Sequence, residues 1–260
     1  MNTIWIVNAF AHAPYTGNPA AIMVVIEFPE EMQRIAAQMN LSETVFAKKL
    51  NKDHFHIRWF TPLVEVKLCG HATLAAAHIL FQEKQISGNK ILFDSLSGPL
   101  EVTRRDNTIM LNFPLQPVGH TLDKTSFETL LDLPSQIDEV VQAYDDVIVA
   151  LYDEQTLRSL QPDFEKVKQI EARGVIITAP SKQYDFVSRF FAPRVGVNED
   201  PVTGSSHCKL ADYWAKRLQK KTFHAYQASQ RGGKLVIQVE NGRVFLQGNA
   251  ITIMQGQWLV

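Results

Sequence analysis

The sequence lacks long apolar runs and has no excess of charge of either sign. No run approaches the roughly 20 apolar residues that a transmembrane helix requires, and 26 basic residues are balanced by 27 acidic ones without a charge block. The sequence therefore predicts no membrane partner and no nucleic-acid partner. An anionic membrane surface and a nucleic acid are each bound by clustered basic side chains, which this chain lacks. A strand-like run at residues 4–7 leaves no room for a signal peptide. We therefore expect a cytoplasmic protein whose partner is a small molecule.

Cysteine is scarce, and the common metal and cofactor motifs are missing. The two cysteines are Cys69 and Cys208, which a reducing compartment keeps as thiols. The sequence has no Cys-x-x-Cys or His-Glu-x-x-His spacing and no glycine-rich dinucleotide or phosphate loop. No lysine lies in a context typical of a pyridoxal Schiff base. The sequence predicts no metal and no cofactor.

Two short polar segments each lead into a helix-forming run. Residues 68–73 are Leu-Cys-Gly-His-Ala-Thr, and residues 199–207 are Glu-Asp-Pro-Val-Thr-Gly-Ser-Ser-His. The N–H groups and the positive dipole end of each following helix are expected to face the segment. A small carboxylate binds well at such a helix start.

The two segments belong to an internal repeat. Gly70 and Gly204 are each followed by a serine after 25 positions and by a further glycine three positions later. Each copy then continues into a hairpin, and the second hairpin turns at Asn241-Gly242, a strong hairpin signal. The repeat predicts two similar domains, residues 1–115 and 116–251, with a last strand near 252–260 as a candidate addition to the first.

Hydrophobic periodicity predicts mixed α+β structure. The helix after Gly70 is apolar on nearly every face, which is typical of a helix enclosed by sheet. We expect strands over 21–28, 42–50, 54–60, 146–151, 174–179 and 184–191, and helices over 29–40, 154–160 and 163–172.

Six ordered motifs resemble those of the PhzF-like family, named for a phenazine-biosynthesis isomerase. They are residues 17–20, 42–46, 60–62, 68–73, 199–205 and 227–233. The resemblance spans almost the whole chain. It implies the diaminopimelate epimerase-like fold, in which two pseudo-symmetric domains, each a rolled, mostly antiparallel sheet around a central helix, hold the active site in the cleft between them.

The resemblance also implies roles for individual residues. Glu43 is the acid/base that moves a proton between carbon atoms of a small carboxylic acid, without a cofactor. The other catalytic positions are His71, Asp200 and Ser205, and the substrate-binding positions are Asn18, Cys69, Gly70, Ala72, Thr203, Gly204 and Ser206. The family resemblance further implies a homodimer.

The residue types alone leave other readings open. Glu43 also suits the solvated face of a strand, His71 suits a helix start, and Asp200 before a proline suits a turn. A racemase or epimerase of amino or hydroxy acids that uses Glu43 and Cys69 as its two bases is one alternative. A small-acid binder without catalysis is another.

Thr203 bears on the choice of mechanism. Two-thiol racemases of this superfamily place a cysteine before the glycine in both halves, whereas this chain has Cys69 in the first and Thr203 in the second. A threonine hydroxyl is too weak an acid to replace a thiol without an activating base. The sequence therefore favours relocation of a proton by a single base.

Overall fold

The computed structural model describes residues 2–83 and 86–260. The chain folds as two compact units, one formed by the residues up to Phe113 together with Phe245–Val260, and one formed by Pro114–Val244. The segment that returns to the first unit begins at Phe245, earlier than the strand near 252–260 considered from the sequence. Within the described residues, no helix is long and apolar enough to cross a membrane.

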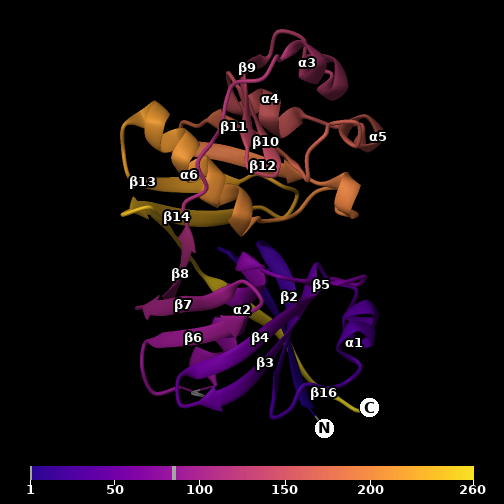
Figure 1. Ribbon diagram of the computed structural model, residues 1–260, viewed down its shortest axis with the longest axis vertical. Helices are drawn as coiled ribbons and strands as arrows, with labels where there is room; N and C mark the ends of the chain where they lie inside the picture. The colour runs from indigo at the N-terminus through magenta and orange to yellow at the C-terminus, as the bar shows by residue number, and fades with distance from the viewer. Residues whose placement is uncertain (1, 84–85) are drawn as a thin grey trace. The chain divides into compact units, whose positions relative to one another are not determined.

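The first unit is a mixed sheet with two helices (Figure 1). Its strands are hydrogen-bonded in the order β16-β1-β2-β3-β4-β6-β7-β8, with β5 on β4. The pairs β2–β3 and β4–β6 are parallel, and helices α1 and α2 lie in the two crossovers that parallel pairing requires. The elements are β1 (Asn2–Ala9), β2 (Asn18–Val25), α1 (Met32–Met39), β3 (Glu43–Asn51), β4 (His54–Phe60), β5 (Glu65–Val66), α2 (Gly70–Gln82), β6 (Lys90–Ser95), β7 (Gly98–Arg105), β8 (Thr108–Pro114) and β16 (Ala250–Trp258).

Helix α2 forms the centre of the first unit. Every residue from His71 to Ala77 is buried, as are Ile79, Leu80 and Phe81, and α2 contacts β1, β2, β3 and β16. The alanine-rich sequence allows this because small side chains let the strands approach the helix closely on several sides. The prediction of a helix enclosed by sheet is confirmed.

The second unit repeats this plan. Its strands follow the order β14-β13-β12-β11-β10-β9, with parallel pairs β10–β11 and β12–β13. Helices α4 and α5 lie in the first crossover and α6 in the second. The elements are α3 (Thr125–Leu131), β9 (Ile137–Ala143), β10 (Asp146–Leu151), α4 (Glu154–Ser159), α5 (Phe164–Val167), β11 (Val175–Pro180), β12 (Phe186–Phe191), the 3-10 turn η1 (Pro193–Val195), α6 (Gly204–Leu218), β13 (Thr222–Gln227), β14 (Gly233–Glu240) and β15 (Arg243–Gly248), in which the chain returns to the first unit.

Backbone conformation confirms two features of the repeat. Gly98 and Gly232, which follow the paired serines, have φ of 88° and 66°, a left-handed conformation that glycine adopts without strain. Asn241 and Gly242 have φ of 48° and 72°, as a tight hairpin turn between β14 and β15 requires. The helices, together with the antiparallel and parallel strand pairs, confirm the predicted α+β fold class.

Two predicted helices were too long, and the first, predicted over 29–40, forms only over Met32–Met39. The sequence predicted a helix over 163–172, but α5 ends at Val167. The N–H groups of Gln169 and Ile170 donate to the carbonyls three residues earlier, so the chain tightens into turns. Arg173 then donates its N–H to Asp145, which leads the chain into β11.

Candidate active site

Two neighbouring strands, β2 and β3, begin with polar residues at the same end of the sheet. Asn18 is the first residue of β2 and Glu43 is the first residue of β3, and the strands run parallel with Ala20 opposite Glu43. Gly17 precedes Asn18 with φ of 77°, and a Cβ there would lie 2.3 Å from the carbonyl oxygen of Ala9. Only glycine fits this turn, which fixes where β2 begins.

The start of α2 lies against the starts of β2 and β3. Cys69 is the extended residue before the helix, and the first helical hydrogen bond runs from the N–H of Thr73 to the carbonyl of Cys69, at 3.1 Å. The Thr73 hydroxyl donates to the same carbonyl at 2.6 Å. The N–H groups of Gly70, His71 and Ala72 precede this bond, at the positive end of the helix.

His71 joins these residues into one cluster. Its Nε2 lies 2.9 Å from Oε2 of Glu43, its Nδ1 lies 3.1 Å from the side-chain amide nitrogen of Asn18, and Nδ1 is 3.5 Å from Sγ of Cys69. Because an ionised carboxylate only accepts, the ring carries a proton on Nε2 and donates it to Glu43. The His71 side chain is 5% exposed and that of Glu43 is 16% exposed, so the carboxylate keeps an opening to solvent.

Burial and neighbouring charged groups shift the pKa values of His71 and Cys69. Burial lowers the pKa of His71, but the Cys69 and Glu43 side chains outweigh it by charge and hydrogen bonding, so the pKa is raised well above its usual value. Burial, with the charge of Glu43, raises the pKa of the Cys69 thiol to about 11. Because that thiol is protonated near neutral pH, Glu43 is the anion that favours a charged His71 there.

The start of α6 holds the matching residues of the second unit. Thr203 is the extended residue before this helix, as Cys69 is before α2. The Thr203 hydroxyl donates to Oδ2 of Asp200 at 2.5 Å. Gln227, fully buried, accepts the N–H of Thr203 at 2.8 Å and donates to the backbone carbonyl of Asp200 at 2.7 Å. The segment 200–203 is therefore held by both backbone and side-chain bonds.

The carbonyl of Thr203, at the start of α6, accepts two side-chain hydrogen bonds. The hydroxyl of Ser206 and Nδ1 of His207 donate to the carbonyl of Thr203 at 2.9 Å and 2.7 Å. Gly204 lies at the first helical position and is buried. Ser205 is half-buried, and its hydroxyl accepts from the guanidinium of Arg173 at 3.3 Å.

Arg173 belongs to a network of four charged side chains. Its guanidinium pairs with Asp146 at 2.5 Å and with Asp145 at 2.9 Å. Lys209, one helical turn after Ser205, pairs with both aspartates, and the side chains of Lys209 and Asp146 are 1% and 0% exposed. The charges of the four groups balance, which is what burial at this depth requires.

The predicted site residues thus form one group in each unit. The structure brings Asn18, Glu43, Cys69, Gly70, His71 and Ala72 together in the first unit, and Asp200, Thr203, Gly204, Ser205 and Ser206 in the second. A shared cleft remains a prediction. Sequence analysis missed Gln227 and Arg173 as site residues. Gln227 opens the motif at 227–233, a signal that could have found it, whereas Arg173 has no motif.

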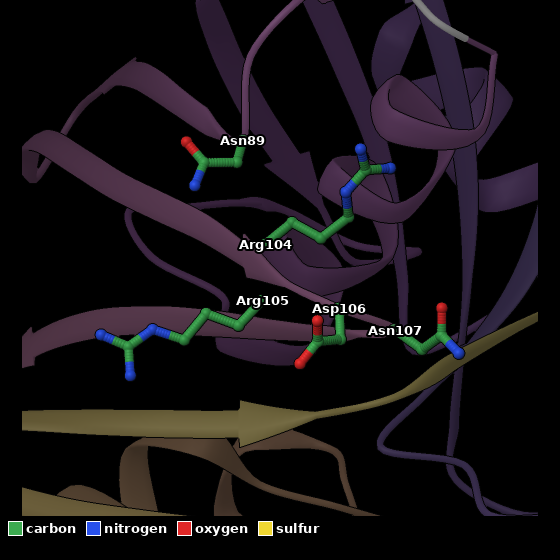
Figure 2. A pocket seen from close by; sticks show the side chains of 5 residues that line it. All are labelled: Asn89, Arg104, Arg105, Asp106 and Asn107. Atoms are coloured by element: carbon green, nitrogen blue, oxygen red, sulfur yellow. The ribbon is translucent and has the colours of Figure 1, made fainter.

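A hollow on the described surface of the first unit includes no residue of either group in its lining. It measures about 710 Å³ and is lined by Asn89, Arg104, Arg105, Asp106 and Asn107 (Figure 2). The side chains of Arg104 and Arg105 point in different directions, and the Arg104 guanidinium lies 4.7 Å from the centre of the Phe81 ring. The two arginines therefore do not converge on one anion.

Comparison with known proteins identifies the family of this chain. The PhzC-PhzF family profile, described as phenazine biosynthesis-like protein, matches residues 7–256. The chain belongs to the PhzC-PhzF family. An uncharacterized isomerase of Pseudomonas aeruginosa is 45% identical over 253 residues, 96% of each chain. One from Halalkalibacterium halodurans is 44% identical over 263 residues, covering 99% of this chain and 98% of that protein.

Solved structures give the same family. The crystal structure of a PhzF family protein from Enterococcus faecalis has a TM-score of 0.95 and 40% sequence identity, covering 100% of this chain and 99% of that one. The structure of a predicted epimerase from Pseudomonas aeruginosa has a TM-score of 0.82 at 19% identity and covers 100% of both chains. The predicted PhzF resemblance and the epimerase-like fold are confirmed. With relatives named isomerases along their full length, this PhzC-PhzF member is an enzyme of the isomerase type.

Proposed function

We propose that this PhzC-PhzF member is a cofactor-independent isomerase of a small carboxylic acid, with Glu43 as the base that relocates a proton. The observation that carries the proposal is the Glu43–His71 pair, 2.9 Å apart and only partly open to solvent. A carboxylate held by a buried imidazole is positioned to accept a proton from a carbon acid and to return it.

The proposed binding site for the substrate lies at the helix starts. A substrate carboxylate beside the N–H groups of Gly70, His71 and Ala72 would meet the positive end of α2. In the proposed reaction a C–H bond breaks and its proton moves to Oε of Glu43, where it exchanges with solvent, and Glu43 then donates a proton to another carbon of the substrate. No oxidant, reductant or second substrate is required. Asp200 and Ser205 would contact the substrate from the second unit.

Proton exchange with solvent tests this proposal. Cyclic and unsaturated amino or hydroxy acids are incubated with the enzyme in deuterium oxide, and label incorporation is followed by NMR or mass spectrometry. The parent enzyme should introduce deuterium into its substrate, whereas a binder without catalysis should not. Glu43→Gln keeps the size of the side chain and removes the charge, so we expect the exchange rate to fall by about 10²–10⁴-fold.

A second carboxylate of the first unit provides the matched control. Glu101 pairs with Lys90 at the surface, with its side chain 42% exposed. Glu101→Gln makes the same chemical change away from the cluster and should exchange at the parent rate. Parent-like exchange by Glu43→Gln would show that another group is the base.

A further inference from the structure

The Glu43 cluster contains a third functional group that proton relocation does not use. Glu43, Cys69 and His71 each point one ligand-type atom into a common space, and all these atoms lie within 4.8 Å of one another. Among the described residues this is the one group of three or more such side chains that is close enough to hold a metal ion. Cys69 and His71 are 7% and 4% exposed, so the cluster is open to solvent mainly at Glu43.

The donor set suits a borderline-soft cation. Thiolate, imidazole and carboxylate are the ligands that zinc takes in proteins, and hard cations such as magnesium and calcium avoid sulfur. Three protein ligands leave a fourth position open, as in zinc sites that exchange water or substrate.

The distances are close to those of a tetrahedral site. Zinc bonds of about 2.3 Å to sulfur and about 2.0 Å to nitrogen and oxygen place two ligand atoms roughly 3.3–3.6 Å apart. In the cluster, Nε2 of His71 lies 4.0 Å from Sγ of Cys69 and 2.9 Å from Oε2 of Glu43. All the ligand atoms lie within 4.8 Å of one another, so side-chain movements on the order of 1 Å would bring them to the required spacing. Asn18, 3.1 Å from Nδ1, would orient the ring from its other side.

We propose that Glu43, Cys69 and His71 form a reversible binding site for zinc or a similar borderline-soft divalent cation, and that its occupancy blocks proton transfer. On binding, the S–H bond of Cys69 and the N–H bond at Nε2 of His71 break, metal–sulfur and metal–nitrogen bonds form, and both protons pass to solvent. The Glu43 carboxylate becomes a ligand and no longer accepts a proton from carbon. The blocking of catalysis rests on the proposed function, whereas metal binding does not.

This site was not foreseen from the sequence, which predicts no metal. Local spacing motifs detect ligands that lie on one helix or loop. Here Glu43 begins β3, while Cys69 and His71 flank the start of α2. The parallel register of β2 with β3 and the crossover through α2 bring them together.

Cobalt(II) titration of the full chain, freed of metal with a chelator, tests binding without reference to activity. We expect a thiolate-to-cobalt charge-transfer band that saturates at a single equivalent and is lost when zinc is added. Cys69→Ser should remove the band and weaken zinc binding by at least about tenfold. Cys208→Ser is the matched control, because Cys208 is a buried thiol outside the group of ligand atoms, and it should behave as the parent.

The proposal fails if the parent gives no band, or if the band survives in Cys69→Ser. Should Cys69→Ser not fold, Glu43→Gln and His71→Gln decide instead, since each should weaken cobalt binding by at least about tenfold.

The blocking role is tested by adding zinc to the deuterium-exchange assay. Cobalt binding with exchange that zinc does not inhibit would overturn the blocking role. Cobalt binding in a chain without any exchange would overturn the proposed function and leave the metal site standing.

Discussion

Oε2 of Glu43 and Nε2 of His71 lie 2.9 Å apart, although one residue begins a strand and the other begins a helix. The contact links the proposed base to the helix start that would bind the substrate carboxylate. It also couples the charge of one residue to the titration of the other, so a change at Glu43 should be measurable at His71 without any substrate.

Glu43→Gln should lower the pKa of His71. Burial lowers this pKa, and the charges and hydrogen bonds of Cys69 and Glu43 raise it above 6.5, so loss of the carboxylate leaves burial less opposed. A group with a raised folded pKa stabilises the fold fully below its unfolded pKa and loses that stabilisation as pH rises through the folded pKa. The parent should therefore lose this part of its free energy of unfolding above about pH 6.5, and the variant should lose less.

NMR of the histidine ring carbons at a series of pH values measures the pKa of His71. Urea unfolding at several pH values measures how the free energy of unfolding depends on pH. Glu101→Gln serves again as the control and should leave both curves unchanged. An unchanged His71 titration in Glu43→Gln would mean that the 2.9 Å contact does not set its charge.

The elements of this fold were easier to predict than the contacts among them. The helix starts at Gly70 and Gly204 and the Asn241-Gly242 hairpin follow from local rules, because the residues that decide them are neighbours in sequence. The contact between Glu43 and His71 depends on strand register and a crossover connection, which local rules do not specify. The contacts of Gln227 with Asp200 and Thr203 join residues far apart in sequence, so local rules do not specify them either, although the motif that Gln227 opens marked the residue itself.

Cys69→Ser separates the single-base mechanism from the racemase alternative. The thiol pKa of about 11, raised by burial and by Glu43, leaves little thiolate at neutral pH, so Cys69 is a poor base. We expect kcat to fall by less than about tenfold, or ~1.4 kcal/mol in the barrier, far less than in Glu43→Gln.

Iodoacetamide gives an independent measure, because it reacts with the thiolate. Labelling of Cys69 in the parent should be slow at neutral pH. Rapid labelling that substrate prevents, together with near-complete loss of exchange in a folded Cys69→Ser protein, would establish the two-base racemase instead.

Lys209→Met tests the buried network behind Ser205. The change leaves Asp146, whose side chain is fully buried, with Arg173 as its remaining partner in the network. Removing one member of a buried ion network costs about 3 kcal/mol of the free energy of unfolding. Lys209→Met combined with Asp146→Asn removes one charge of each sign and should recover most of the loss. Urea unfolding of both variants checks this, and an equally large loss in the double variant would show that the damage is packing and not charge.

His207 should make the protein sensitive to acid. Burial lowers its pKa to about 4, although the hydrogen bond to the Thr203 carbonyl partly opposes this. A group with a lowered folded pKa binds its proton more readily when unfolded, so stability is lost as pH falls from about 6.5 towards about 4. Over that interval the loss from His207 is on the order of 3 kcal/mol.

His207→Asn isolates this contribution because the asparagine amide can still donate to the Thr203 carbonyl but does not titrate. We expect the variant to be less stable than the parent at pH 7, since the ring also packs against Phe186 with centroids 6.3 Å apart. Between pH 6.5 and 4, however, its free energy of unfolding should fall less steeply than that of the parent. Equal slopes for the two proteins in urea unfolding would mean that His207 takes up its proton without unfolding the start of α6.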